Sequence, residues 1–375
     1  MSSPSVKPVH SLLLISFPHQ LLHALSALRY YRIREGVSEQ KPAIIFVWSF
    51  KSSEHAPNSS LRIFLDSVLR EFPFITLVFP TLHERRYELS SFRPLVHRVA
   101  WVRNRLRTFS VDAIFFAHDA SADQTAQVLM QSFLDAMAVC FGDPPGFLYP
   151  QFQLQHHGNS IKRLFWRSRS RGLASLRSPL LSIITINFGQ KTQVSDRDVL
   201  VPPRSLVTKT LEDIQRGVDT INHDLSVDYK NQEKSADRPN LLLISNFSES
   251  GLMNSRNELA LYIDICERFL KRGDKLIVKP HFGTSSKFIK KLTKSLSAYR
   301  LEMLLGISGR IPIESYPELI KRFNVISVSS SSALLSYLFE GQISHALTAD
   351  DIEKYFKADR VAYMLEANQA IENLL

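Results

Sequence analysis

The alternation of short apolar runs with amphipathic stretches constrains the fold most strongly. Residues 12–17 form a mainly apolar run, and residues 20–32 then place Leu21, Leu25 and Leu28 at helical spacing. The same alternation predicts strands at residues 12–17, 43–50, 74–79, 112–117, 136–141, 181–187, 240–245, 275–278, 302–305 and 325–328. Strands that alternate with helices are typical of parallel sheets covered on both faces. We therefore expect an α/β protein.

The length of the chain indicates more than one domain. Its 375 residues exceed what a single hydrophobic core usually serves. The regular alternation is interrupted by a polar stretch at residues 201–239 and resumes at residue 240. We expect two Rossmann-like, doubly wound domains facing a central cleft, at residues 1–200 and 240–375, with a crossover at 201–239.

Composition narrows the class of protein. Hydrophobic residues make up 44% and charged residues 22%, as in ordinary globular proteins, and the formal net charge is +10. The positive charge favours an anionic partner, which is a nucleic acid, an acidic membrane face or an acidic substrate. Two cysteines in apolar surroundings argue against a disulfide framework or a zinc site and fit a reducing cytoplasm. No apolar run reaches the ~18 residues of a membrane-spanning helix.

Ligands of doubly wound sheets bind beyond the carboxyl ends of the strands, so polar residues in those loops are the first candidates. Lys279, Pro280 and His281 directly follow the strand at 275–278, and Gly283 lets the backbone pass close to a ligand. His281 is placed to donate to a phosphate or a leaving oxygen. The alternative, a histidine that merely fills the loop, carries equal weight on the sequence alone.

Three further segments of the C-terminal half carry candidate ligands. The serine run 329–332 precedes an apolar helix, where hydroxyls and backbone N–H groups bind anions; simple helix capping needs only one serine. Ser330, Ser331 and Ser332 are therefore candidate phosphate ligands. Glu314 is a candidate for the hydroxyls of a ribose, or else a solvated surface residue. Asn246 and Ser248 follow the strand at 240–245 and form either a nucleotide contact or a plain capping loop.

The N-terminal half offers weaker candidates. Asp143 lies in the sequence Gly-Asp-Pro-Pro-Gly after the strand at 136–141, and is either a general base or the first residue of a proline-fixed turn. Gln20, His118 and Arg167 are candidates for the acceptor side. Arg167 belongs to a basic stretch at residues 162–177 that suits an acidic polymer, an anionic membrane face or plain solvent. The histidines lack a third ligand at metal-site spacing, so we expect no metal.

Several other functions are disfavoured by missing motifs. The chain contains no G-x-x-x-x-G-K-[ST] loop, no G-x-S-x-G elbow and no G-x-G-x-x-G fingerprint. It also contains no base-reading module, so we expect no nucleic-acid partner.

The order of these loops resembles that of the bacterial sialyltransferases and polysialyltransferases of the GT-B fold. That family carries an acidic motif, then a His-Pro motif, then a Ser-Ser/Thr motif, and here the order is Asp143, His281 and the serines 329–332. Many members have an acidic residue between the last two motifs, where this chain has Glu314. The segment 15–22 also resembles the start of polysialyltransferase-type chains. Phe282 stands where the family has proline, and the acidic motif lacks the second acid.

The resemblance implies an inverting transfer of sialic acid, or a related nonulosonic acid, from a CMP-activated donor to a glycan hydroxyl. Asp143 would be the base and His281 the acid or phosphate ligand. Glu314 would hold the ribose and the serines the phosphate, with Lys279, Asn246 and Ser248 also beside the nucleotide. Neither a metal nor another cofactor is implied. The resemblance further implies a cytoplasmic enzyme of capsule or lipooligosaccharide synthesis, peripheral to the inner membrane.

Two alternatives stay open. One keeps the fold and changes the donor to CMP-Kdo or a UDP-sugar. The other is a non-catalytic basic binding protein on a decayed transferase scaffold, which the nonstandard acidic motif favours.

Overall fold

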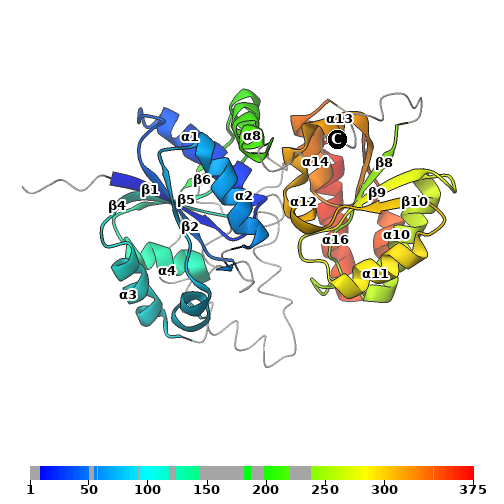
Figure 1. The fold of residues 1–375 in the computed structure, drawn as a ribbon, viewed down its shortest axis with the longest axis horizontal. Helices are drawn as coiled ribbons and strands as arrows, with labels where there is room; N and C mark the ends of the chain where they lie inside the picture. Colours follow the sequence, from blue (N-terminus) through cyan, green and yellow to red (C-terminus); the bar gives the residue numbers. More distant parts are fainter. Residues whose placement is uncertain are drawn as a thin grey trace, which may run out of the picture. The chain divides into compact units, whose positions relative to one another are not determined.

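The computed structural model describes residues 9–49, 55–56, 58–90, 93–117, 124–142, 181–186, 198–219, 238–340 and 342–375. These residues form two compact units, the first ending at Val218 and the second beginning at Asp219. Figure 1 shows each unit as a sheet with helices packed on it. The first unit takes in a helix that lies within the stretch 201–239, which the sequence predicts as the crossover.

The first unit is built on a seven-stranded parallel sheet of order β3-β2-β1-β4-β5-β6-β7. Helices lie on both faces, with α1, α2 and α8 on one and α3 and α4 on the other (Figure 1). The strands are β1 (Val9–Ile15), β2 (Ala43–Val47), β3 (Ile75–Val78), β4 (Ser110–Phe116), β5 (Met137–Cys140), β6 (Leu181–Ile183) and β7 (Asp198–Leu200). The helices are α1 (Gln20–Arg34), α2 (Ser60–Val68), α3 (Leu95–Arg105), α4 (Gln124–Ser132) and α8 (Arg204–Asp219), with short turns η2 (Leu69–Glu71) and η3 (Glu84–Glu88).

The apolar sequence of β1 follows from its central place in this sheet. Leu12 is paired with Ile44 of β2 on one side and with Ile114 of β4 on the other. All three side chains are 0% exposed, because helices cover both faces. A strand buried on both faces needs an apolar side chain at nearly every position, so the continuous run predicted a parallel sheet correctly.

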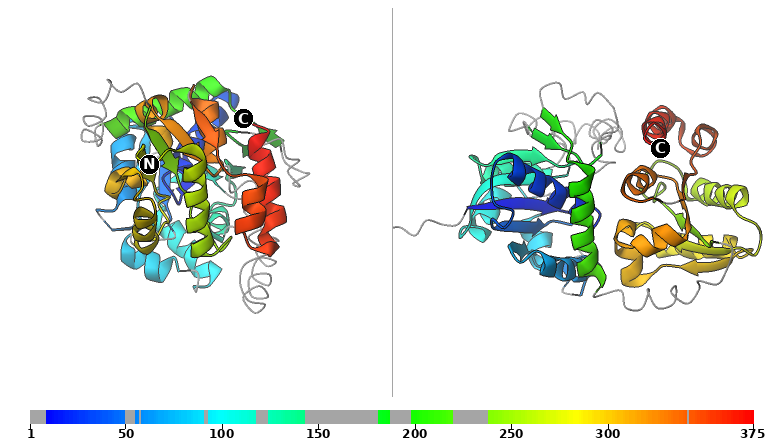
Figure 2. Two further views of the ribbon diagram at one scale, coloured as in Figure 1. Left: turned by 90° about the vertical axis from the view of Figure 1, so that its right-hand side faces the viewer. Right: turned by 90° about the horizontal axis from the view of Figure 1, so that it is seen from above.

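Helix α8 belongs to the first unit because it packs tightly on α1 and α2 (Figure 2). The guanidinium of Arg29 on α1 pairs with the carboxylate of Asp213 on α8. The Ser67 hydroxyl on α2 donates to the Gly217 carbonyl oxygen at 2.6 Å. A β-carbon on residue 217 would lie 2.5 Å from the Val68 Cα atom, so only glycine permits this approach.

We expect Gly217→Ala to lower the free energy of unfolding by up to about 2 kcal/mol. In an exposed helix the same change stabilises by roughly 1 kcal/mol, but overpacking against backbone costs about 1–3 kcal/mol. Urea unfolding measures the difference, and Glu212→Ala, on the exposed face of the same helix, should leave the midpoint nearly unchanged. A Gly217→Ala protein more stable than the wild type would contradict the close packing of α8.

The second unit is a five-stranded parallel sheet of order β10-β9-β8-β11-β12. Figure 1 shows α10 and α11 on one face and α13 and α14 on the other. The strands are β8 (Asn240–Leu243), β9 (Lys275–Lys279), β10 (Arg300–Met303), β11 (Asn324–Ser327) and β12 (Ile343–His345). The helices are α10 (Ser255–Phe269), α11 (Ser286–Ser295), α12 (Gly306–Arg310), the turn η4 (Ile313–Ser315), α13 (Pro317–Arg322), α14 (Ser331–Leu338), α15 (Ala349–Tyr355) and α16 (Ala358–Glu372).

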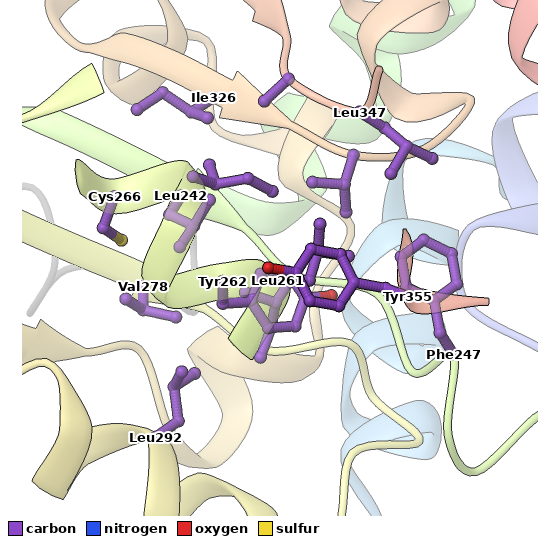
Figure 3. Close-up of a cluster of buried hydrophobic side chains, with 14 of the residues drawn as sticks. Leu242, Phe247, Leu261, Tyr262, Cys266, Val278, Leu292, Ile326, Leu347 and Tyr355 are labelled. Carbon is purple, nitrogen blue, oxygen red and sulfur yellow. The ribbon is translucent and has the colours of Figure 1, made fainter. Parts of the chain in front are cut away.

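The core of the second unit lies between this sheet and α10 (Figure 3). Leu242, Val278 and Ile326 point into it from three neighbouring strands, since alternate residues of a strand face the same side. Cys266 of α10 lies in the same cluster, and burial raises the pKa of its thiol to about 12. Cys140 of β5 is buried in the first unit.

The structure corrects the predicted elements at a few places. Strands β7 and β12 have three residues each, and no strand is predicted at either position. Helix α3 begins at Leu95, because Pro94 with an extended ψ of 145° stands at its N-cap. In the part of the chain that the structure describes, no helix has the length and apolarity needed to cross a bilayer.

Candidate functional site

The candidate site lies where the strand order of the second sheet changes direction. β8 leads to β9 and β10 on one side, and β11 then starts again on the other side of β8. In open parallel sheets ligands bind at such a switch point, beyond the carboxyl ends of the strands. The loops after β8, β9 and β11 therefore share one edge, and they carry Asn246 and Ser248, His281, and the serines 329–332.

The ring of His281 is held by its own loop. Its Nδ1 accepts a hydrogen bond from the Gly283 N–H at 3.0 Å, and its carbonyl accepts the Thr284 N–H at 2.9 Å. The Phe282 ring packs against it with centroids 4.0 Å apart. Phe282 thus supports the histidine at the position where the resemblance leads one to expect proline. Since Nδ1 is an acceptor here, a neutral ring carries its proton on Nε2 and can donate from that atom.

Asn246 of the β8 loop lies next to the His281 loop. A β-carbon on residue 283 would be 2.6 Å from Asn246 Nδ2 and 3.0 Å from His281 Nδ1. Both nitrogens therefore lie within 3.0 Å of one point, so a β-carbon at residue 283 would displace the Asn246 or His281 side chain. The structure brings these two predicted site residues together.

Lys279 and Glu314 form a second part of the site, at the end of β9. The Lys279 ammonium donates to the Gly309 carbonyl oxygen at 2.8 Å, which fixes α12 against the strand end. Burial lowers the pKa of Lys279 to about 8, although the nearby Glu314 carboxylate acts in the opposite direction. Glu314 is only 5% exposed, so it is not the solvated surface residue that the sequence left as an alternative.

The lowered pKa of Lys279 makes the stability of the protein depend on pH. The unfolded chain keeps the proton up to the ordinary value of 10.5, while the folded chain releases it near pH 8. Between these values the unfolded state binds more protons, so stability rises with pH. Relative to Lys279→Met, the wild type should gain on the order of 3 kcal/mol from pH 7.5 to pH 10.5, because each pKa unit is worth about 1.4 kcal/mol.

Urea unfolding of both proteins across this range measures the gain. In Lys287→Met, which removes an exposed lysine of α11, the free energy of unfolding should change with pH as it does in the wild type. A constant difference between wild type and Lys279→Met at all pH values would show that the ammonium is not buried.

The serines of the run 329–332 differ in how deeply they are buried. Ser330 is the N-cap of α14 but makes no side-chain capping bond, and Ser331 is half-buried beside it. Ser332 is 0% exposed, and its hydroxyl lies 2.7 Å from the Ser329 carbonyl and 2.8 Å from His345 Nδ1. The Ser331 hydroxyl accepts a hydrogen bond from the Ser329 hydroxyl at 3.3 Å, which leaves its own hydrogen to donate. Ser330 and Ser331 therefore stay the candidate phosphate ligands at this helix N-terminus.

Glu258 of α10 is a residue of this region that loop-by-loop reasoning missed. It is 1% exposed, and its carboxylate accepts the Phe247 N–H at 2.9 Å, the Ser248 N–H at 3.0 Å and the Ser248 hydroxyl. Ser248, a predicted nucleotide ligand, therefore anchors the loop that carries Asn246. The available signal was an acid on the apolar stripe of α10, four residues before Tyr262.

Of the candidate residues in the N-terminal half, only Gln20 lies within the residues that the structure describes. Asp143, His118 and Arg167 lie outside the described residues. Gln20 is 1% exposed, and its Oε1 accepts the Ser16 N–H at 2.8 Å and the Phe17 N–H at 3.3 Å. It shapes the turn between β1 and α1. Within the described ranges, no three His, Cys, Asp or Glu side chains gather as a metal site requires.

Comparison with solved structures gives matches of low similarity. A UDP-GlcNAc 2-epimerase from Neisseria meningitidis is 11% identical, with a TM-score of 0.49, covering 87% of this chain and 78% of that one. A glycosyltransferase from Rickettsia africae is 11% identical, with a TM-score of 0.46, covering 98% and 93%. We infer no function from similarity at this level. A search of curated proteins found no match.

The sequence itself matches a known family. The model of the alpha-2,8-polysialyltransferase family matches residues 187–348. This range contains His281, Glu314 and the serine run, and it leaves Asp143 outside. The match confirms the resemblance drawn from the sequence motifs, and the two parallel sheets confirm the predicted pair of Rossmann-like domains. The chain is a glycosyltransferase that is similar, over residues 187–348, to the alpha-2,8-polysialyltransferases.

Proposed function

We propose that the protein transfers sialic acid, or a related nonulosonic acid, from a CMP-activated donor to a glycan hydroxyl with inversion at the anomeric carbon. The observation that carries the proposal is the approach of Asn246 to the His281 loop at the switch point of the second sheet, where the serine turn follows the adjacent strand β11. The family match supports sialic acid as the sugar.

The nucleotide lies along this edge in the proposed complex. Ser330 and Ser331 hold the phosphate at the start of α14, where backbone N–H groups and the helix dipole favour an anion. Glu314 accepts the ribose hydroxyls, and Lys279 keeps positive charge beside it. Asn246 contacts the nucleotide from the neighbouring loop.

The chemical step needs a base on the acceptor and help for the leaving group. Asp143 removes the proton of the attacking hydroxyl, which is supported by its place in the motif order alone. His281 donates from Nε2 to the departing phosphate, since its Nδ1 is engaged by the Gly283 N–H. CMP is a good leaving group, so positioning and proton transfer are sufficient without a metal in this proposal. The positive charge of the chain and its basic stretch at 162–177 suit an acidic glycan or an anionic membrane face.

A nucleotide screen tests the proposal. The purified protein is titrated calorimetrically with CMP, UDP, GDP and ADP, and then assayed for turnover of CMP-sialic acid with oligosialic acid as acceptor. We expect CMP to bind at least tenfold more tightly than the others. A preference for UDP would indicate that the donor is a UDP-sugar. Failure to bind any of these nucleotides would contradict the proposal.

A further inference from the structure

A chain of mostly part-buried hydrogen bonds runs from the serine turn into the C-terminal helix. The Ser332 hydroxyl contacts His345 Nδ1 at 2.8 Å, and His345 Nε2 contacts Asn368 Oδ1 at 2.7 Å. The Asn368 amide nitrogen in turn donates to the Leu347 carbonyl at 3.2 Å and to Glu372 at 2.9 Å. The chain thus joins α14, β12 and α16, three elements separate in sequence.

The donors and acceptors of this chain can be assigned. Both hydrogens of the Asn368 amide are used by Leu347 and Glu372, so its Oδ1 must accept, and His345 Nε2 must carry a proton. Burial lowers the pKa of His345, which favours the neutral ring at neutral pH. In a neutral ring Nδ1 is then an acceptor, so the one hydrogen of the Ser332 hydroxyl is shared between His345 Nδ1 at 2.8 Å and the Ser329 carbonyl at 2.7 Å.

We propose that His345 is a positioning residue for the donor phosphate: by holding the Ser332 hydroxyl, it fixes the turn of residues 329–331 in the shape that the phosphate requires. Ser332 also donates its backbone N–H to the Ser329 carbonyl at 3.0 Å, so its side chain and main chain hold the same turn. His345 itself does not touch the reacting atoms. The proposal rests on the proposed function, which gives Ser330 and Ser331 to the phosphate.

Substitutions at His345 can separate its two hydrogen bonds. In His345→Asn the side-chain amide replaces Nδ1 and keeps the contact with Ser332, whereas in His345→Gln it reaches the place of Nε2 and keeps the contact with Asn368. His345→Leu removes both. A positioning role toward the phosphate requires the Ser332 contact, so Asn should rescue and Gln should not.

The expected result is specific for donor binding. His345→Leu and His345→Gln should raise the KM for CMP-sialic acid and the Kd for CMP about tenfold, as for the loss of one hydrogen bond, with kcat within about threefold of the wild type. His345→Asn should stay within about threefold in all three quantities. Circular dichroism and the melting temperature establish that each variant is folded.

A matched pair of serines decides the question even if a His345 variant does not fold. Ser332→Ala should raise the CMP Kd about tenfold, as His345→Leu does. Ser327→Ala should leave it unchanged, since Ser327 is also 0% exposed but its hydroxyl has no hydrogen-bond partner among the described residues. The proposal is overturned if Ser332→Ala binds CMP as the wild type does, or if Asn and Leu at position 345 are equally impaired. A wild type that binds no CMP overturns the proposed function instead.

Discussion

Replacing His281 by asparagine should lower kcat for transfer from CMP-sialic acid by roughly 10²–10⁴-fold, while the protein stays folded. Asparagine can still accept the Gly283 N–H in place of Nδ1, so the loop keeps its shape. What is lost is the N–H at the position of Nε2, which we propose to donate to the leaving phosphate. His281→Gln restores an amide near that position and should recover part of the loss.

Steady-state kinetics with varied donor measure these effects. The control is Lys287→Gln, an exposed residue of the following helix, which should retain the wild-type kcat. If His281→Asn turns over at the wild-type rate with an acceptor that the wild type uses, His281 has no part in the chemistry. If His281→Asn and His281→Gln are equally inactive, a donor at Nε2 is not sufficient, and the ring itself is required.

Removing the carboxylate of Glu258 should produce the largest loss of stability, on the order of 3 kcal/mol or more for Glu258→Ala. The carboxylate accepts two backbone N–H groups and one hydroxyl in a place that water does not reach. Each buried donor left without an acceptor costs about 1–3 kcal/mol. Because the same loop carries Asn246, the affinity for CMP should fall as well.

The pH dependence of this contribution has an unusual direction for a carboxylate. Burial raises the pKa of Glu258 above its ordinary value of 4.5, so the folded protein binds the proton first as pH falls. The stabilising contribution is therefore complete below the unfolded pKa and is lost as pH rises through the folded pKa. The advantage of the wild type over Glu258→Gln should grow from pH 7 toward pH 4.5.

Urea unfolding at several pH values tests both statements. Glu366→Gln, an exposed acid on α16, should show neither effect. A Glu258→Ala protein with wild-type stability would mean that the loop finds other acceptors. A difference from Glu258→Gln that shrinks toward acid pH would mean that the fold favours the charged carboxylate, so that its hydrogen bonds outweigh its burial.

The parallel architecture was predictable because it depends on burial, which leaves a direct mark in sequence. β1 and residues 113–116 of β4 are buried on both faces and form apolar runs in the sequence. β12 was not predictable, since Ile343, Ser344 and His345 are all half-buried at the edge of the sheet and show no pattern. The strand is defined by its pairing with β11, a contact between distant residues.

The candidate site was likewise predictable from the sequence only in part. A parallel sheet brings its carboxyl-end loops to one edge, so the nearness of Asn246 and His281 follows from the predicted strands. The roles of Ser248 and Ser332 do not follow, because each is engaged by a partner on another element, the buried Glu258 and the half-buried His345. A serine that supports a loop from within looks the same in sequence as one that faces a ligand.

The positions of the two cysteines allow the units to be followed separately. Cys140 lies in the first unit and Cys266 in the core of the second, both buried, and they are the only cysteines of the chain. A thiol reagent reaches each one only when its own unit opens, since burial shields the sulfur and holds Cys266 in the unreactive thiol form. Pulse alkylation followed by peptide mass spectrometry therefore gives two independent opening rates from an unmodified chain. Comparing them with and without CMP would reveal which unit the nucleotide protects.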